Sequence, residues 1–340
     1  MGAEPRIVSI LDRSGTGRAL IEAAENLGVP TQGIDARNTL DLKAIERTRR
    51  VLLTLRSHVV HAHDLRSAVF ALRSARGLRV KKVATAHGST RESWKKRIYL
   101  EIFERILLPR FDRVHVVSDP LAEHLKSQGV PPEKIRVIPN GVDESVIRCP
   151  AGPNPYRALK GDPTLSAVGR LTEDKGFSVL LQATALLKKD FPSLCLLVAG
   201  SGPRESKLLD EVRVLGLENC VHFLGRVDCI AWVYDLSDVL VIPSLREGLP
   251  CVLVEAMLAG LPVVATEVGA IPDVLHKGDL GRLVPPADVG ALVQGIREVA
   301  RHLESFRVLA GKARQVAREC YTAEVMSVRY RQLYEEVCRG

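Results

Sequence analysis

The sequence predicts an α/β protein with two doubly wound, Rossmann-like domains that face a central cleft. Apolar runs of strand length alternate with helical periodicity along the whole chain, which is typical of parallel sheets covered by helices. At 340 residues the chain is long for one core, and 46% of its residues are hydrophobic, as packed globular domains require. Residues 149–162 form a Pro- and Gly-rich stretch that is typical of an interdomain linker.

These observations set the predicted domain bounds. We expect a first domain over residues 1–150 and a second over residues 163–320. Residues 321–340 should form a terminal helix, because their apolar residues are partly periodic. The two halves share a strand–helix rhythm, and the sequence contains no other repeat and no low-complexity segment.

Charge is distributed unevenly between the two halves. Residues 1–150 hold 26 Lys and Arg against 17 Asp and Glu, whereas residues 151–340 hold 22 against 23. A basic half of this kind is compatible with an anionic membrane, an acidic substrate or a solvated surface. Nucleic acid is a less favoured partner, because the basic residues come without a recognised binding module or repeated aromatic residues.

Cysteine usage and the start of the sequence favour a cytoplasmic protein. The seven cysteines are scattered without a C-x-x-C pair, which favours reduced thiols over a disulfide framework or a zinc site. The opening sequence lacks the basic and apolar regions of a signal peptide, and no apolar run approaches the ~18 residues of a membrane-spanning helix. Peripheral contact with the inner face of the cytoplasmic membrane stays open.

The predicted first domain carries candidate site residues at two turns. Its strands are expected at residues 6–11, 31–34, 58–62, 82–86, 113–117 and 135–138, and its helices at 19–27, 40–55, 65–75, 93–108 and 120–128. Gly15 and Gly17 follow the first strand, where a phosphate is commonly held, although the third glycine of a dinucleotide fingerprint is missing. His87 follows a later strand and so leaves its carboxyl end, at the edge where α/β proteins bind ligands.

Two histidines of the first domain alternate at strand spacing. His61 and His63 therefore lie on the same face of a strand. A metal site is disfavoured, because no cluster of acids or cysteines completes a ligand set. We expect a packing or hydrogen-bonding role at the end of the strand.

Residues 93–108 are predicted to form an amphipathic helix. Ile98, Ile102 and Ile106 make one apolar row, which favours an ordinary helix packed on the sheet. The basic start of this helix lies beside Trp94. Contact of that end with an anionic bilayer or a phosphorylated lipid acceptor therefore stays open.

The predicted second domain places two cations on one loop. Its strands are expected near residues 165–168, 194–199, 221–227, 239–242, 263–266 and 281–284, with helices between them. Arg170 and Lys175 lie five residues apart between a strand and a helix, so they suit a diphosphate, Arg170 bidentately and Lys175 as a point charge. Gly200 and Gly202 follow the next strand and permit close approach of a ligand.

Residues 241–266 hold two carboxylates in a strand–loop–helix–strand unit. Glu247 lies in the loop, and Glu255 lies in an almost wholly apolar helix, where an acid is costly unless something hydrogen-bonds to it. A pair of sugar hydroxyls meets that need. Gly248 lets a ligand approach the backbone, and the following helix N-terminus offers free N–H groups to a phosphate.

These residues lie in recognisable sequence motifs. The segments S-x-x-E-G-L-P and E-A-M-x-x-G-x-P-V-V-A-T around the two acids, together with G-R-L-x-x-x-K-G around the two cations, resemble the retaining nucleotide-sugar glycosyltransferases of family 4. The resemblance covers residues 15–337 and is dense over residues 169–273. It implies the GT-B fold, a terminal helix that crosses back to the first domain, and catalysis without a bound metal or cofactor.

The resemblance also assigns roles to single residues. Arg170 and Lys175 hold the diphosphate, Glu255 takes the ribose hydroxyls and Glu247 meets the donor sugar. The residues expected along the donor are His87 against its sugar and phosphate, Gly248 and Leu249 through their backbone N–H groups, and the glycines Gly15, Gly17, Gly200 and Gly202.

The activity implied is transfer of a sugar from a UDP-, GDP- or ADP-sugar to a saccharide or lipid-linked saccharide, in cell-surface polysaccharide or glycolipid biosynthesis. No side chain is an evident nucleophile, so we expect no covalent intermediate and assign deprotonation of the acceptor to the donor phosphate. A nucleotide-sugar 2-epimerase of the same fold and a non-catalytic nucleotide-sugar-binding subunit stay open as alternatives. The sequence does not specify the sugar, the base or the acceptor.

Overall fold

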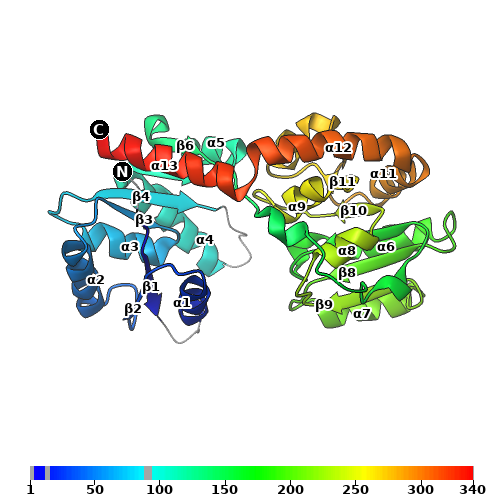
Figure 1. Cartoon of the computed structure of the whole chain (residues 1–340), viewed down its shortest axis with the longest axis horizontal. Coiled ribbons are helices and arrows are strands. Elements are labelled where there is room, and N and C mark those ends of the chain that lie inside the picture. Colours follow the sequence, from blue (N-terminus) through cyan, green and yellow to red (C-terminus); the bar gives the residue numbers. More distant parts are fainter. Residues whose placement is uncertain (1–3, 12–15, 88–93, 340) are drawn as a thin grey trace. The chain divides into compact units, whose positions relative to one another are not determined.

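The computed structural model describes residues 4–11, 16–87 and 94–339. The chain divides into two compact units: Met1–Ile138 together with Val328–Gly340, and Pro139–Ser327 (Figure 1). All strand pairs among the described residues are parallel, which confirms the predicted α/β class. The domain bounds expected from the sequence stay predictions. Within the same described ranges, no helix is both long enough and apolar enough to cross a membrane.

The strands of the first unit form two parallel sheets, one of order β1-β2 and one of order β3-β4-β5-β6. These strands are β1 (Ile7–Leu11), β2 (Thr31–Asp35), β3 (Val59–Ala62), β4 (Lys81–Ala86), β5 (Arg113–Val116) and β6 (Ile135–Val137). The four-stranded sheet buries side chains such as Val114 and Val116 against Phe111 and Leu125, so its core is continuous with the helices that cover it.

The helices of the first unit follow the predicted strand–helix alternation. They are α1 (Thr16–Asn26), α2 (Leu42–Thr54), α3 (Leu65–Ser74), α4 (Trp94–Glu101), the π-helical turn η1 (Ile102–Leu107), the 3-10 turns η2 (Leu108–Arg110) and η3 (Pro132–Lys134), α5 (Asp119–Ser127) and the last part of α13 (Ala323–Arg339). The capping side chains Asp41 and Asp64 accept backbone N–H groups at the starts of α2 and α3. These caps satisfy backbone N–H groups in the first turn of each helix, which stabilises both helix starts.

The prediction that the apolar row of residues 93–108 packs on the sheet is wrong. Ile98, Ile102 and Ile106 are 48%, 40% and 47% exposed, whereas Phe103 is buried. The helix changes from α to π geometry at Ile102, and the N–H of Leu108 bonds to the carbonyl of Phe103. A π turn spaces its hydrogen bonds by five residues rather than four, so the side chains after Ile102 leave the simple helical register. Ile98 precedes the π turn and is exposed on α4 itself.

The second unit is built on one six-stranded parallel sheet of order β12-β11-β10-β7-β8-β9. Its strands are β7 (Thr164–Val168), β8 (Cys195–Ala199), β9 (Val221–Gly225), β10 (Val239–Ile242), β11 (Val263–Thr266) and β12 (Arg282–Val284). The chain runs from β7 outward through β8 to β9, then returns to β10 beside β7 and runs outward in the opposite direction. This reversal is a topological switch point, and ligands of doubly wound sheets bind at the carboxyl ends of the strands that flank it.

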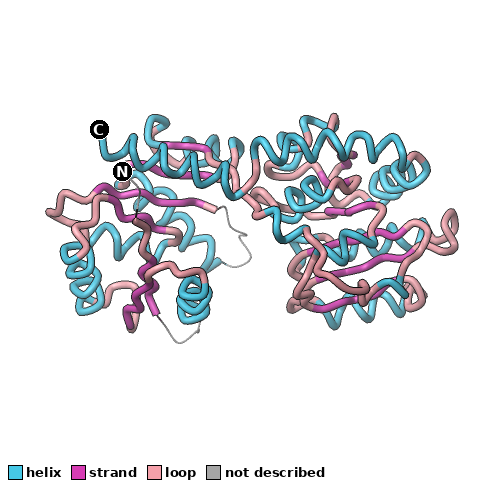
Figure 2. The backbone as a smooth tube through the Cα atoms, viewed as in Figure 1, coloured by secondary structure: helices cyan, strands magenta, loops and turns pink. Residues whose placement is uncertain are grey.

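Helices lie on both sides of this sheet, as Figure 2 shows. They are α6 (Phe177–Leu187), α7 (Glu205–Val214), α8 (Ala231–Leu236), α9 (Cys251–Ala259), α10 (Ile271–Val274), α11 (Val289–Arg301) and α12 (Leu303–Cys320), with the 3-10 turns η4 (Glu144–Ile147), η5 (Arg157–Leu159), η6 (Glu173–Lys175) and η7 (His276–Gly278). All of β8 and β10 is buried, as expected for central strands covered on both faces. The sheet therefore holds the loops at its carboxyl edge on a rigid base.

Candidate active site

The loops that follow β7 and β10 carry the predicted charged residues of the second unit. Arg170 and Lys175 lie after β7, and Glu247 lies after β10. Because β7 and β10 are hydrogen-bonded neighbours, their carboxyl ends meet at the same edge of the sheet. The charged residues thus lie at the switch point, where the fold itself favours ligand binding.

The structure brings Lys175 and Glu247 into direct contact. The ammonium Nζ of Lys175 lies 2.6 Å from Oε1 of Glu247, and the two side chains are only 20% and 8% exposed. The hydroxyl of Ser244 donates to the same carboxylate oxygen at 2.7 Å. An ammonium group has three N–H donors, so Lys175 keeps two for another acceptor. The pair therefore places a fixed positive charge beside an acid that is itself held in one orientation.

Backbone contacts lock the two loops against each other. The carbonyl of Asp174 accepts the N–H of Leu245 at 2.7 Å, and Thr266 on β11 donates its hydroxyl to the carbonyl of Ser244 at 2.6 Å. Gly176 has a φ of 67°, and a Cβ there would collide with the carbonyl oxygen of Pro243. Glycine is therefore required where the end of the β7 loop meets the end of β10.

Glu255 lies on α9 and is hydrogen-bonded by a tyrosine. The hydroxyl of Tyr234, on α8, donates to Oε2 of Glu255 at 2.6 Å. Burial raises the pKa of the Glu255 carboxyl, and the bond from Tyr234 partly opposes that rise. One carboxylate oxygen is thus engaged, and the other is available to hydroxyl donors of a ligand.

The start of α9 lies between the two acids. The helix begins after Pro250, and no side chain caps it. In the part of the chain that the structure describes, no acceptor takes the backbone N–H groups of Gly248 and Leu249. The carbonyl of Gly248 accepts the N–H of Ala270 at 2.9 Å, which fixes the loop. These N–H groups and the uncapped helix end are unused donors of the kind that bind anions in other proteins.

Arg170 and the two glycines of the β8 loop flank this arrangement. Arg170 is exposed, and none of the described residues forms an ion pair with it. A Cβ on Gly200 would collide with the carbonyl oxygen of Gly169, and one on Gly202 would lie 2.6 Å from the carbonyl oxygen of Leu171. The space that these glycines leave is used for close packing of the β8 loop on the β7 loop. Donor binding at Gly200 and Gly202 stays a prediction.

The remaining predicted site residues belong to the first unit. Gly15 lies outside the described residues. Gly17 lies in α1, and its carbonyl accepts the hydroxyl of Ser9 on β1 at 3.0 Å. His87 directly follows β4 and is exposed, and desolvation lowers the pKa of its imidazole. Their contact with a donor stays a prediction.

The expected role of His61 and His63 is confirmed. Nδ1 of His61 lies 2.7 Å from the hydroxyl of Tyr334, and Nε2 lies 2.7 Å from that of Thr85. The rings of His61 and His63 stack with centroids 4.4 Å apart. Among the described residues, no group of three or more His, Cys, Asp or Glu side chains is placed to hold a metal ion.

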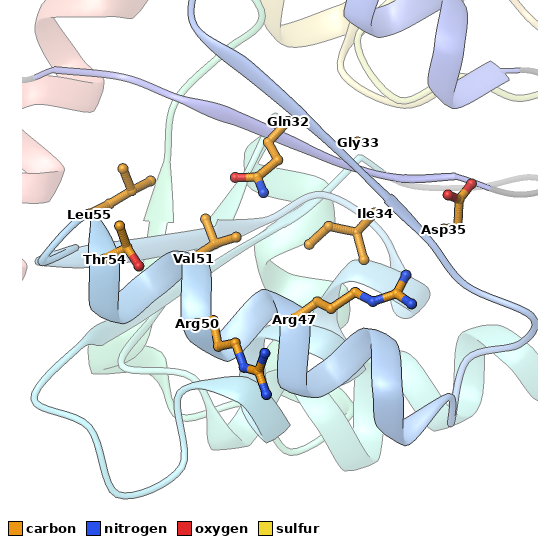
Figure 3. Close-up of a pocket in the computed structure, with 9 residues that line it drawn as sticks. All are labelled: Gln32, Gly33, Ile34, Asp35, Arg47, Arg50, Val51, Thr54 and Leu55. Carbon is orange, nitrogen blue, oxygen red and sulfur yellow. The ribbon is translucent and has the colours of Figure 1, made fainter.

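A pocket of about 320 Å³ lies elsewhere in the first unit, between β2 and α2 (Figure 3). Gln32 and Asp35 line it from the strand, and Arg47 and Arg50 line it from the helix. Arg50 pairs with Glu46 at 3.4 Å on an exposed part of the helix. None of the predicted site residues lines this pocket, so it is separate from the arrangement described above.

Sequence reasoning missed Ser244 and Tyr234. Both lie beside apolar runs, where a single polar residue is easily taken as a core residue. Ser244 carries a weak signal, because it immediately follows a buried strand and precedes Glu247 by three residues. Tyr234 carries none, because its partner lies 21 residues further along the chain.

Comparison with known families adds an independent finding. Residues 2–146 match the family described as Glycosyltransferase Family 4, and residues 162–302 match the one described as Glycosyl transferases group 1. The phosphatidyl-myo-inositol mannosyltransferase of Mycobacterium leprae is 31% identical over 333 residues, which are 94% of this chain and 84% of that protein. The N-acetyl-alpha-D-glucosaminyl L-malate synthase of Bacillus anthracis is 27% identical over 285 residues, or 83% of this chain and 74% of that protein.

Solved structures share the fold at lower identity. Anabaena HepE in complex with UDP has a TM-score of 0.83 at 18% identity, over 97% of this chain and 99% of that chain. The same protein in complex with UDP and glucose has a TM-score of 0.84 at 19% identity, over 97% of this chain and 99% of that chain. The sucrose-phosphate synthase of Thermosynechococcus elongatus has a TM-score of 0.78 at 21% identity, over 98% of each chain. At these identities the likeness concerns the fold, and it confirms the predicted GT-B fold.

Proposed function

Because the chain belongs to glycosyltransferase family 4, we propose that it moves a sugar from a nucleoside-diphosphate sugar to a saccharide or lipid-linked saccharide, with retention of the anomeric configuration. The setting that we propose is cell-surface polysaccharide or glycolipid assembly. The observation that carries the proposal is the contact of Lys175 with Glu247 at the switch point of the second sheet. It is supported by the UDP that HepE, a protein of the same fold, holds in its crystal structures.

In this proposal the donor diphosphate lies against Arg170, Lys175 and the start of α9. Arg170 offers a bidentate fork, and Lys175 offers the two donors that Glu247 does not use. The free N–H groups of Gly248 and Leu249 add two neutral donors. Together these groups stabilise the negative charge that develops on the departing nucleotide.

The two acids, Glu255 and Glu247, contact the nucleoside and the donor sugar. The ribose hydroxyls donate to the Glu255 oxygen that Tyr234 leaves open, and the donor sugar lies against Glu247. Breaking the bond between the anomeric carbon and the phosphate oxygen releases the nucleoside diphosphate. The acceptor oxygen bonds to the same carbon, and its proton passes to the released phosphate. No protein–sugar bond forms, and no metal takes part.

The acceptor is proposed to be presented at or near an anionic membrane. Ile98, Ile102 and Ile106 are exposed apolar side chains of the first unit, and residues 1–150 carry all the excess positive charge of the chain. Apolar and basic residues on one unit suit the surface of an anionic bilayer. Co-sedimentation with vesicles that contain anionic lipid, but not with neutral vesicles, is the expected result, and an Ile102→Asp variant should weaken it.

Product analysis with and without an acceptor tests the proposed reaction. We expect an anomer-retaining glycoside only when an acceptor is present, and no mass increase on the protein. Turnover of the donor without an acceptor into an epimeric sugar would replace the proposal with a 2-epimerase. A trapped glycosyl-enzyme would refute the mechanism, and binding of the donor without any turnover would point to a non-catalytic subunit.

A further inference from the structure

Three imidazole rings form a row at one end of the first unit, which we call the histidine column (His61, His63 and His87). The ring centroids of His61 and His63 are 4.4 Å apart with 27° between their planes. Those of His63 and His87 are 5.7 Å apart with 22° between their planes. His63 is therefore the middle ring, stacked on both of its neighbours.

The base of the column is held by a network of hydrogen bonds. Nε2 of His115 lies 2.7 Å from the carbonyl oxygen of Ile138, so this nitrogen carries the proton. Nδ1 of His115 is therefore an acceptor, and the hydroxyls of Thr85 and Tyr330 lie 3.0 Å and 2.9 Å from it. Nε2 of His61 lies 2.7 Å from the hydroxyl of Thr85, and its Nδ1 lies 2.7 Å from that of Tyr334. Contacts on both ring nitrogens fix the ring plane of His61.

The rings of the column favour the neutral form. Desolvation, together with the smaller like-charge effect of His63, lowers the pKa of His61 to about 2. Desolvation also lowers the pKa of His63 and of His87, while the carboxylate of Asp64 acts in the opposite direction on both. Stacked imidazoles without charge do not repel one another, so the row is compatible with neutral pH.

We propose that His63 is a positioning residue that holds the ring of His87 in one orientation at the carboxyl end of β4. His61, fixed by Thr85 and Tyr334, provides the flat support on which His63 lies. The proposal rests on the proposed function only for the contact of His87 with the donor. The ring contact itself is independent of that function.

Two substitutions of His63 distinguish a role of its flat ring from a role of its ring nitrogens. His63→Phe keeps a flat ring in the row, whereas His63→Ala removes it. We expect His63→Ala to lower kcat by about tenfold to a hundredfold with little change in the donor KM, because a small misplacement of a reacting group has effects of this size. His63→Phe should stay within about threefold of the wild type. His58→Ala is the matched control, because His58 is an exposed histidine just before β3.

The ring geometry has its own readout by NMR of histidine-labelled protein. In the wild type and in His63→Phe, ring-proton contacts between position 63 and His87 should be present. In His63→Ala we expect the His87 resonances to average over several orientations and its pKa to rise toward ~6.5, because water replaces the missing ring. Asp64 remains in all three proteins, so it does not produce the difference.

The outcomes are distinguishable from failure of the proposed function. If His63→Ala keeps wild-type kcat, or if His63→Phe is as impaired as His63→Ala, His63 does not act by positioning. Unchanged His87 resonances and pKa in His63→Ala would also overturn the proposal. A wild-type protein without transferase activity would count against the proposed function, while the NMR comparison would still decide whether His63 orients His87.

Discussion

The two units hold the polar side chains at their sheet edges in different ways. In the second unit, each of the two candidate site acids has a specific partner: Glu247 forms an ion pair with Lys175, and Glu255 accepts a hydrogen bond from the hydroxyl of Tyr234. In the first unit, the rings of the histidine column stack on one another, and none of the acids that the structure describes forms a hydrogen bond with them. Burial raises the pKa of Glu255 and lowers that of His61, so both shifts favour the uncharged form.

The comparison indicates what each edge is suited to do. A partly buried cation beside free backbone N–H groups is suited to a charged ligand and to charge that appears during a reaction. A neutral stack of rings brings no positive charge to a diphosphate, but it orients the ring at its exposed end. We therefore assign charge stabilisation to the second unit and orientation to the first.

The largest expected effect is on the Lys175–Glu247 pair. Lys175→Ala and Glu247→Ala should each lower kcat for sugar transfer by about a hundredfold to a thousandfold, as for removal of one preorganised group at a developing charge. Steady-state kinetics with a single donor measures this. The double variant should be little worse than either single one, because the two residues act as a unit.

Ser244→Ala is the control for that experiment. It removes only a neutral hydroxyl from the same carboxylate oxygen, so its effect should be much smaller than that of Lys175→Ala. Equal effects of the two variants would mean that the orientation of Glu247, rather than the charge of Lys175, determines the rate.

The pH dependence of stability should have opposite signs in the two units. His61 and His115, whose pKa values are lowered to about 2 and about 4, bind fewer protons when folded than when unfolded. Their contribution is complete above pH ~6.5 and is lost as pH falls, by about 1.4 kcal/mol per pH unit for each histidine. Glu255 has a raised pKa, so its contribution to stability is lost as pH rises through the range above its ordinary value.

Denaturant unfolding of wild type and His61→Gln at several pH values between about 4.5 and about 7 tests the predicted loss of the histidine contribution to stability on acidification. The variant should show a shallower loss of stability on acidification, because one titrating group is gone. A parallel pH dependence in the two proteins would contradict a neutral, buried His61.

A smaller effect is expected at Tyr234. Tyr234→Phe removes the hydroxyl that donates to Glu255 at 2.6 Å, so the carboxylate loses its fixed orientation. We expect the donor Kd to rise about tenfold, in line with the ~1.5–3 kcal/mol of a hydrogen bond to a charged group. Calorimetric titration measures it, with Tyr156→Phe as the matched control in the same unit. An unchanged Kd would show that the hydroxyl of Tyr234 does not contribute to donor binding.

The smallest effect is expected at Glu336, on the last part of α13. Hydrogen bonds from Arg136 and Arg113 lower the pKa of its carboxyl, and Arg113 lies 3.0 Å away. The group is largely solvent-accessible, so Glu336→Gln should cost no more than about 1 kcal/mol of stability. A thermal melt at high and low salt measures this cost. A larger, salt-independent loss would show that α13 depends on this contact.

The sequence predicted the positions of the site better than its contacts. Residues that follow parallel strands, such as Arg170, Glu247 and His87, were placed correctly along the chain, because strand ends and motifs are local features. The pairing of Lys175 with Glu247 joins positions 72 residues apart and needed the observed order of β7 and β10. The exposure of Ile98, Ile102 and Ile106 was mispredicted, because hydrophobic periodicity does not show which face of a helix packs on the sheet, nor that a π turn begins at Ile102.

The proposed diphosphate site is tested most directly by a thermal-shift screen of UDP, GDP, ADP and their sugars. The screen compares wild type with Arg170→Ala and with the control Arg213→Ala. A donor at ~100 times its Kd adds about 2.7 kcal/mol of stability, which is readily measured. We expect a shift with one nucleotide that is lost in Arg170→Ala and kept in Arg213→Ala, an exposed arginine of α7. An equal shift in all three proteins, or none with any nucleotide, would contradict the diphosphate site at the ends of β7 and β10.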